Sequence, residues 1–241
     1  MEVLDPKNKK WDRYKLSKAT LVDPLTQEPR AATVALIGLH ILHKTESQPT
    51  WFWATFEHVD NVPGDNEQAV AYNLYNSSCE QQQVKVPANC APNKGTNEQT
   101  YTIGCTPNQS PPYYLCAGAA PVPIQVTRRI PIDEDARAVN KQLQAYIAKN
   151  FPGSVWANYQ VVNMIWSTTP QNEQSNRTPQ GLKSMQPHIP MANSSMETYA
   201  QKLTCFNCHQ FASIANTLNS SNGAYASDFS FVLGFANYKG K

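Results

Sequence analysis

The hydrophobic pattern of the first 60 positions predicts three β-strands. Residues 14–22 carry β-branched residues in partial alternation and end at a turn-forming Asp-Pro pair. Residues 32–44 are almost continuously apolar, which predicts a central strand buried on both faces. Residues 51–60 follow a polar turn and are the natural antiparallel partner of that strand. We expect this pair to form the core and to gather three histidines in one neighbourhood: His40, His43 and His58.

Strand and helix patterns alternate between residues 124 and 166. Residues 124–130 have strand character, and residues 156–166 predict a further strand. Between them, Asp133 is a suitable N-cap for an amphipathic helix, which the Phe-Pro-Gly sequence at 151–153 ends. One stripe of this helix is apolar and is expected to face the core: Val139, Leu143, Tyr146 and Ile147.

A second, shorter helix is predicted over residues 193–204. Ser194 and Glu197 have the S-x-x-E spacing of a capping box. Apolar residues follow at helical spacing: Met196, Tyr199 and Leu203. Together with the strands, these patterns predict an α+β fold, in which an antiparallel β-rich domain carries one amphipathic helix and a small helical segment at the C-terminus.

The predicted elements divide the chain at residue 168. Residues 1–168 form the β-rich domain, and within it a lobe at about 62–125 is rich in Pro, Asn and Gln and has little core-forming pattern. Residues 169–241 contain a polar connection followed by the C-terminal helical segment.

Four cysteines lie in the polar lobe: Cys79, Cys90, Cys105 and Cys116. Two disulfides would stabilise the lobe by constraining its unfolded chain, by about 2–4 kcal/mol each. Three pairings are possible, and we favour the nested one, Cys79 with Cys116 and Cys90 with Cys105, because it closes one compact lobe. Four free buried thiols are the alternative. Disulfides persist in exported proteins, so these cysteines indicate a location outside the cytoplasm.

Charge and hydropathy exclude two classes of partner. The 241 residues have a formal net charge of +2 with no basic cluster, so we expect no nucleic-acid partner. No apolar run approaches the ~20 residues that a membrane-spanning helix needs, so we expect no transmembrane segment. The remaining candidates are small molecules, cofactors and other proteins.

The most specific motif is the Cys-Phe-Asn-Cys-His sequence at residues 205–209. Two thiols at this spacing can each form a thioether to a haem vinyl group, and the adjoining imidazole can bind the iron as proximal ligand. A structural zinc site would need a second cysteine pair, and no second C-x-x-C occurs in the sequence. A redox dithiol is expected directly after a buried strand, whereas a helical pattern precedes Cys205. We therefore predict one covalently attached haem c, held by Cys205, Cys208 and His209.

A second iron ligand has to come from upstream, because neither Met nor His follows His209. The candidates are His188, Met191, Met196, His58 and His40. A strand places His58 and Glu57 on opposite faces, and with its polar neighbours His58 could serve as a distal acid/base group. The alternative is a histidine that only satisfies its own hydrogen bonds at a strand end.

The motif makes the last part of the chain resemble c-type cytochromes. Class I cytochromes c place it near the start and supply a later Met ligand, and four-helix cytochromes have helical upstream sequence, so neither describes the whole chain. Residues 38–44 (GLHILHK) and 53–61 (WATFEHVDN) are similar to a group of exported bacterial cytochrome c-like proteins. This resemblance implies a β-rich domain joined to a haem-binding helix. Since haem c is attached after export, we also expect a leader that precedes this sequence.

These observations predict a mono-haem c-type cytochrome that transfers electrons to a redox partner protein in the periplasm or otherwise outside the cytoplasm. The second hypothesis is a haem-dependent oxidoreductase or a gas sensor, with an open distal site near His58 or His40. The third is a binding module that uses haem only as a structural element. Binding of CO and a high-spin ferric form would separate the second hypothesis from the first.

Overall fold

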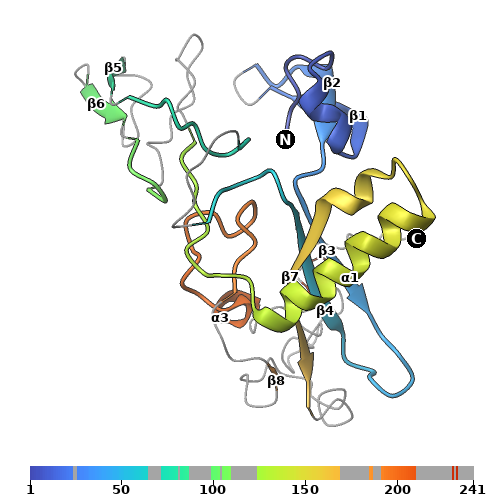
Figure 1. Ribbon diagram of the computed structural model, residues 1–241. Helices are drawn as coiled ribbons and strands as arrows, with labels where there is room; N and C mark the ends of the chain where they lie inside the picture. Colours follow the sequence, from blue (N-terminus) through green and yellow to red (C-terminus); the bar gives the residue numbers. More distant parts are fainter. Residues whose placement is uncertain are drawn as a thin grey trace, which may run out of the picture.

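The computed structural model describes residues 1–23, 26–64, 72–80, 82–86, 99–103, 105–109, 124–168, 185–186, 191–209, 230 and 232. Over these residues the chain has an α+β architecture with antiparallel sheets and one long helix (Figure 1). This confirms the predicted fold class. No helix in the described part is long and apolar enough to cross a membrane.

The main sheet contains four strands in the order β3-β4-β7-β8, all antiparallel. The strands are β3 (Gly38–His43), β4 (Phe52–His58), β7 (Tyr159–Ser167) and β8 (Met185–Gln186). The predicted pairing of residues 51–60 with the preceding apolar segment is confirmed, and its register places His40 opposite Thr55. Thr55 in turn lies opposite Asn163, next to a register shift between β4 and β7. β4 is therefore an inner strand, and β3 is an edge strand.

A separate two-stranded sheet lies at the N-terminus. It pairs β1 (Leu16–Val22) with β2 (Pro29–Ala35), after a short 3-10 helix, η1 (Lys9–Arg13). The prediction of one central strand over 32–44 was wrong, because its two halves pair with different partners and belong to two sheets. The strand of the main sheet begins at Gly38, where a Cβ atom would lie only 2.5 Å from Ser195 Oγ. Segment 193–195 thus approaches the backbone of β3 so closely that only glycine fits.

The long helix α1 (Glu134–Asn150) begins at the predicted N-cap, because Asp133 Oδ1 accepts a hydrogen bond from the backbone N–H of Asp135. It packs on β7 through Asn140, whose side chain both donates to and accepts from the backbone of Val161. The predicted buried stripe was wrong: Val139 is 52% exposed and Tyr146 59% exposed. The face of α1 that packs on the sheet is determined by these hydrogen bonds to β7, which a pattern of apolar residues does not reveal.

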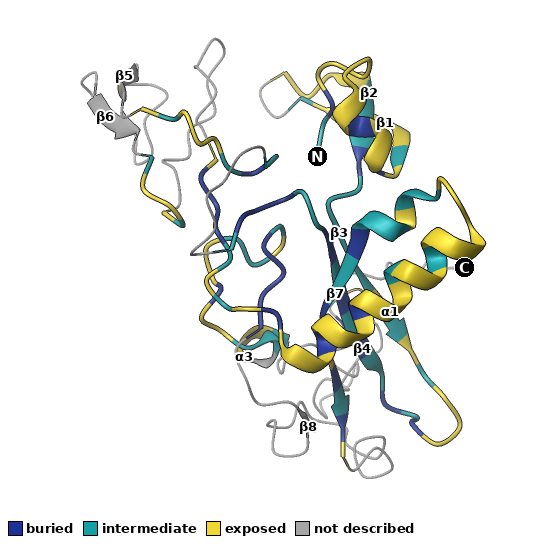
Figure 2. Cartoon of the chain, in the orientation of Figure 1, coloured by how far each residue is buried: buried dark blue, intermediate teal, exposed yellow. Residues whose placement is uncertain are grey.

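Segments on the two faces of the main sheet bury it. On one face Ala136 of α1 packs against Val162, and on the other Met191 packs against Trp53 and Ile165. The buried positions follow β4 and β7 between these layers (Figure 2). A short 3-10 helix, η3 (Val155–Asn158), precedes β7, so this strand begins three residues later than predicted.

The lobe contains a hairpin that the composition did not reveal. It is formed by β5 (Gln82–Val86) and β6 (Gln99–Ile103), and a disulfide joins Cys79 to Cys105 with their Cα atoms 5.7 Å apart. The favoured nested pairing was therefore wrong. An antiparallel hairpin brings the segment before its first strand beside the segment after its second, and Cys79 and Cys105 lie in these two segments. Cys90 and Cys116 lie outside the described residues.

Two further elements differ from the predictions. Residues 124–130 form no strand, and within the described part of the chain they make one isolated bridge, between Arg128 and Gly64. Residues 193–204 form consecutive turns instead of a helix. In both segments, side-chain hydrogen bonds to distant residues replace regular backbone pairing: Gln201 donates to the carbonyl of Thr127 and accepts from the backbone of Arg129.

Candidate functional site

The motif forms a single helical turn, α3 (Cys205–His209). Thr204 caps it: Asn207 Oδ1 accepts hydrogen bonds from the Thr204 backbone N–H at 2.7 Å and from its hydroxyl at 2.9 Å. Residues three and four apart are neighbours on a helix, so Cys205 lies next to both Cys208 and His209. Cys205 and His209 line the cavity described below, whereas Cys208 is exposed.

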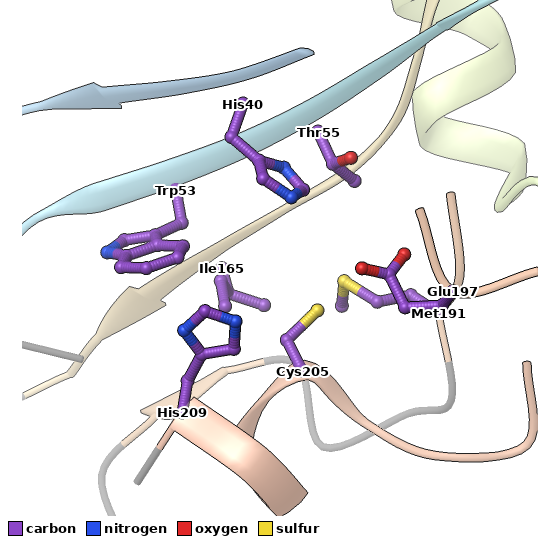
Figure 3. A pocket seen from close by; sticks show the side chains of 8 residues that line it. All are labelled: His40, Trp53, Thr55, Ile165, Met191, Glu197, Cys205 and His209. Carbon is purple, nitrogen blue, oxygen red and sulfur yellow. The ribbon is translucent and has the colours of Figure 1, made fainter. Parts of the chain in front are cut away.

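A small cavity of about 10 Å³, the size of a single water molecule, lies between α3 and the main sheet. Small-molecule sites occupy about 300–1,000 Å³, so a larger ligand would have to move α3 and the sheet apart. Figure 3 shows the sheet on one side and residues of the segment 191–209 on the other. The lining residues are His40, Trp53, Thr55, Ile165, Met191, Glu197, Cys205 and His209.

Strand register places the sheet-side residues on one face. His40 and Thr55 are direct partners in the β3–β4 ladder, and Trp53 pairs with Leu42 on one side and Ile165 on the other. Because alternate residues of a strand share a face, Trp53, Thr55 and Glu57 all point toward segment 191–209. Each of these three side chains is buried.

Polar contacts hold segment 193–204 against the sheet. Asn193 donates through Nδ2 to the Phe56 carbonyl at 2.6 Å and to Thr55 Oγ1 at 3.0 Å. Glu57 Oε2 accepts from both the backbone N–H and the hydroxyl of Ser194, at 2.9 and 2.7 Å. The other carboxylate oxygen of Glu57 forms a buried ion pair with Arg128. These contacts fix the distance between β4 and the motif.

Burial changes the proton affinity of two groups at the site. It raises the pKa of the Cys205 thiol to about 12, with further contributions from Glu197 and Cys208. A dithiol oxidoreductase needs a low-pKa thiolate, so this environment does not suit one. Burial, and then the nearby His209, lower the pKa of His40. His40 is therefore neutral at pH 7 and keeps a lone pair that can bind a metal.

Trp53 supplies a buried donor that has no acceptor. It is 8% exposed, its ring lies 5.0 Å from the His209 ring in an edge arrangement, and Nε1 has no hydrogen-bond partner among the described residues. A buried N–H normally has an acceptor, and leaving it without one costs about 1–3 kcal/mol.

The structure brings only part of the predicted ligand set to the motif. His40 and Met191 line the cavity, whereas Met196 is 43% exposed and outside its lining. His58 is fully buried on the opposite face of β4 and stacks on Tyr14, with ring centroids 3.6 Å apart. His188 lies outside the described residues. The expectation that His40, His43 and His58 share one neighbourhood is therefore wrong.

Four residues of the cavity wall were absent from the predicted haem-attachment and iron-ligand residues: Trp53, Thr55, Ile165 and Glu197. Thr55 could have been found from its alternation with Trp53 along one strand. Ile165 and Glu197 have no such local signal, because the register of β7 and the turns after Asn193 bring them to the cavity.

Comparison with known proteins yields no match: no family model, curated protein or solved structure is significantly similar to this chain. Its function therefore has to be inferred from its own residues and their geometry. Among the described residues, no three His, Cys, Asp or Glu side chains converge to form a metal site by themselves. A porphyrin supplies four in-plane nitrogens, so haem iron needs only one or two ligands from the protein.

Proposed function

We propose that this protein is a mono-haem c-type cytochrome that transfers electrons outside the cytoplasm. The observation that carries the proposal is that α3 presents Cys205 and His209 to a cavity that the main sheet closes on its other side. When bound, haem c supplies an iron centre that exchanges one electron between its ferrous and ferric states. Cys205 and Cys208 would hold the haem by thioethers, and His209 would be the proximal ligand.

The cavity wall suits a flat, mainly apolar group with carboxylates at its edge. Trp53, Ile165 and Met191 form an apolar cluster beside Cys205, and burial of apolar surface contributes about 25 cal/mol per Å². The Trp53 indole N–H lacks an acceptor, and a haem propionate would provide one. The side chains present are therefore of the kinds that contact a haem, which would enter by moving α3 away from the sheet.

The cysteine chemistry supports export. The Cys79–Cys105 disulfide is typical of oxidising compartments such as the periplasm, where haem c also remains attached. A mono-haem carrier there exchanges electrons with another redox protein, which is the partner class that we propose. With a formal net charge of +2 and no basic cluster, the chain has no electrostatic feature that favours nucleic acid.

A haem enzyme or gas sensor is the second candidate function. The cavity wall favours it in one respect, because Thr55 and His40 place polar groups opposite His209, where they could contact a small ligand of the iron. That function requires an open position on the iron. The two functions therefore differ in whether a protein side chain occupies that position.

The attachment can be tested by expressing the chain with an export leader in a bacterium that matures c-type cytochromes. We expect the intact mass to equal the polypeptide plus one haem, and the haem to remain with the chain after denaturation. The double variant Cys205→Ser and Cys208→Ser should lose covalent haem, whereas the control Met196→Leu, at an exposed position, should retain it. A colourless wild-type protein with the mass of the bare polypeptide would refute the proposal.

Electron transfer needs a separate measurement. A potentiometric titration of the exported protein should show a reversible one-electron transition, and the reduced form should not bind CO. A reduced protein that binds CO stoichiometrically would support the enzyme or sensor instead.

A further inference from the structure

We infer that His40 is the second axial ligand of the iron, so that the haem is six-coordinate with two histidines. This inference rests on the proposed function, and it decides between the two candidate functions. Its basis is the placement of His40 and His209 on opposite walls of one cavity, as Figure 3 shows.

Close contacts hold the strand of His40 against the segment that leads into α3. Gly38, two residues before His40, is in contact with segment 193–195, and a Cβ there would lie 3.0 Å from Asn193 side-chain atoms and closer still to Ser195. Asn193 is in turn hydrogen-bonded to Thr55, the register partner of His40. The edge strand is therefore fixed against the segment that continues into α3.

Trp53 contacts both imidazoles from the side. Its ring centroid lies 6.4 Å from that of His40 and 5.0 Å from that of His209. Figure 3 shows the indole beside both imidazoles, where a large rigid side chain limits the orientations of the two rings. The imidazoles are thus oriented before the haem is bound, which favours ligation because little side-chain freedom is lost.

The other described candidates are less suited to this position. Met191 is 4% exposed and packs with Trp53 and Ile165, on the side of the cavity next to Cys205 and not across from His209. Met196 is exposed, and both ring nitrogens of His58 are hydrogen-bonded to the backbone. His43 is on β3 but three residues from His40, so it points to the opposite face and is exposed.

Two histidine ligands have a defined consequence for the chemistry. They make the iron low-spin in both oxidation states, so that it exchanges electrons with little rearrangement and leaves no open position for a gas or peroxide. Histidine in place of methionine also lowers the reduction potential, since Met/His ligation raises it. The protein would then be an electron carrier with a lower potential than the Met-ligated cytochromes c.

The test is spectroscopy of exported, haem-loaded variants. In the wild type we expect a low-spin ferric spectrum without the charge-transfer band of a sulfur ligand. His40→Ala should be high-spin and should bind CO when reduced, and added imidazole should restore the low-spin spectrum. His43→Ala, on the same strand but exposed, should keep the wild-type spectrum, as should Met191→Leu, which conserves volume.

The outcomes separate the inference from the proposed function. A protein without covalent haem overturns both. A protein with covalent haem that is high-spin in the wild type, that shows the sulfur band, or that loses its low-spin signal in Met191→Leu but not in His40→Ala, overturns only the assignment of His40. If His40→Ala does not fold, the wild-type electron paramagnetic resonance spectrum distinguishes bis-histidine from histidine–methionine ligation.

Discussion

His40 and His58 lie on adjacent strands of the same sheet, and their surroundings differ completely. His58 is fully buried: its Nε2–H donates to the Arg13 carbonyl at 3.0 Å, and its Nδ1 accepts from the backbone N–H of Asp60 at 3.1 Å. These contacts fix both its tautomer and its orientation. His40 is half-buried and borders the cavity that also contains Cys205 and His209.

The comparison shows what distinguishes a structural histidine from a candidate ligand. Burial alone does not, because His58 is the more buried of the two. The difference is that the described partners of His58 use both of its nitrogens, whereas His40 has space beside it and a second imidazole across that space. The two faces of β4 differ in the same way. Tyr14 covers the face of His58, and the segment that carries the motif covers the face of Glu57.

The largest expected effect comes from breaking the contact between the sheet and that segment. Glu57→Gln should lower the free energy of unfolding by about 3–5 kcal/mol, because it leaves the buried charge of Arg128 uncompensated. Urea denaturation followed by circular dichroism measures this. Glu46→Gln, at an exposed position, is the matched control and should change stability by less than about 0.5 kcal/mol. Equal effects in the two variants would mean that Glu57 does not hold the site together.

The next largest effect on stability is expected at His58, and it tests whether His58 and His40 have different roles. His58→Ala should lower the free energy of unfolding by about 2–3 kcal/mol, because it leaves the Arg13 carbonyl and the Asp60 N–H without their partner. Unlike His40→Ala, it should leave the haem spectrum unchanged. A change of spin state in the His58 variant would place this residue at the iron and contradict the separation of the two faces.

A smaller effect is expected from pH. Burial lowers the pKa of His58 below its ordinary value of 6.5, so below pH 6.5 the unfolded chain binds a proton that the folded chain does not. Stability should therefore be fully present above that pH and should fall as the pH drops toward the folded pKa, by up to about 1.4 kcal/mol per pH unit. Urea midpoints between pH 7.5 and 5 in wild type and His58→Gln test this, and the variant should show the shallower slope. Parallel slopes would exclude His58 as the source.

The smallest effect on stability is expected from Trp53→Phe, and its size should differ between the haem-free and the haem-loaded protein. Trp53→Phe removes an N–H that has no described acceptor, so in the haem-free chain it should change stability by less than about 1 kcal/mol. In the haem-loaded protein the same variant should lose about 1–1.5 kcal/mol more, because a hydrogen bond to a propionate is lost. Thermal and urea denaturation of both forms provide the comparison, and identical losses would contradict the propionate contact.

Local signals in the sequence were sufficient wherever one segment decides its own structure. The spacing of the motif predicts the helical turn α3, Asp133 marks the start of α1, and the turn before residue 51 predicts the β3–β4 pair. The disulfide partner of Cys79 was not predictable, because a polar hairpin without an apolar pattern brings Cys105 beside it.

The order of amino acids alone specifies two thiols and an imidazole at the spacing of one helical turn, and the two strands that carry His40 and His58. Only the tertiary structure decided which histidine borders the motif, which face of α1 is buried, and where the apolar run 32–44 is divided between two sheets. The physical reason is range. A helical turn or a cap depends on residues three or four apart. Whether one face of a strand is covered or borders a cavity depends on residues far away in the chain, such as Ser194 for Glu57 and Tyr14 for His58.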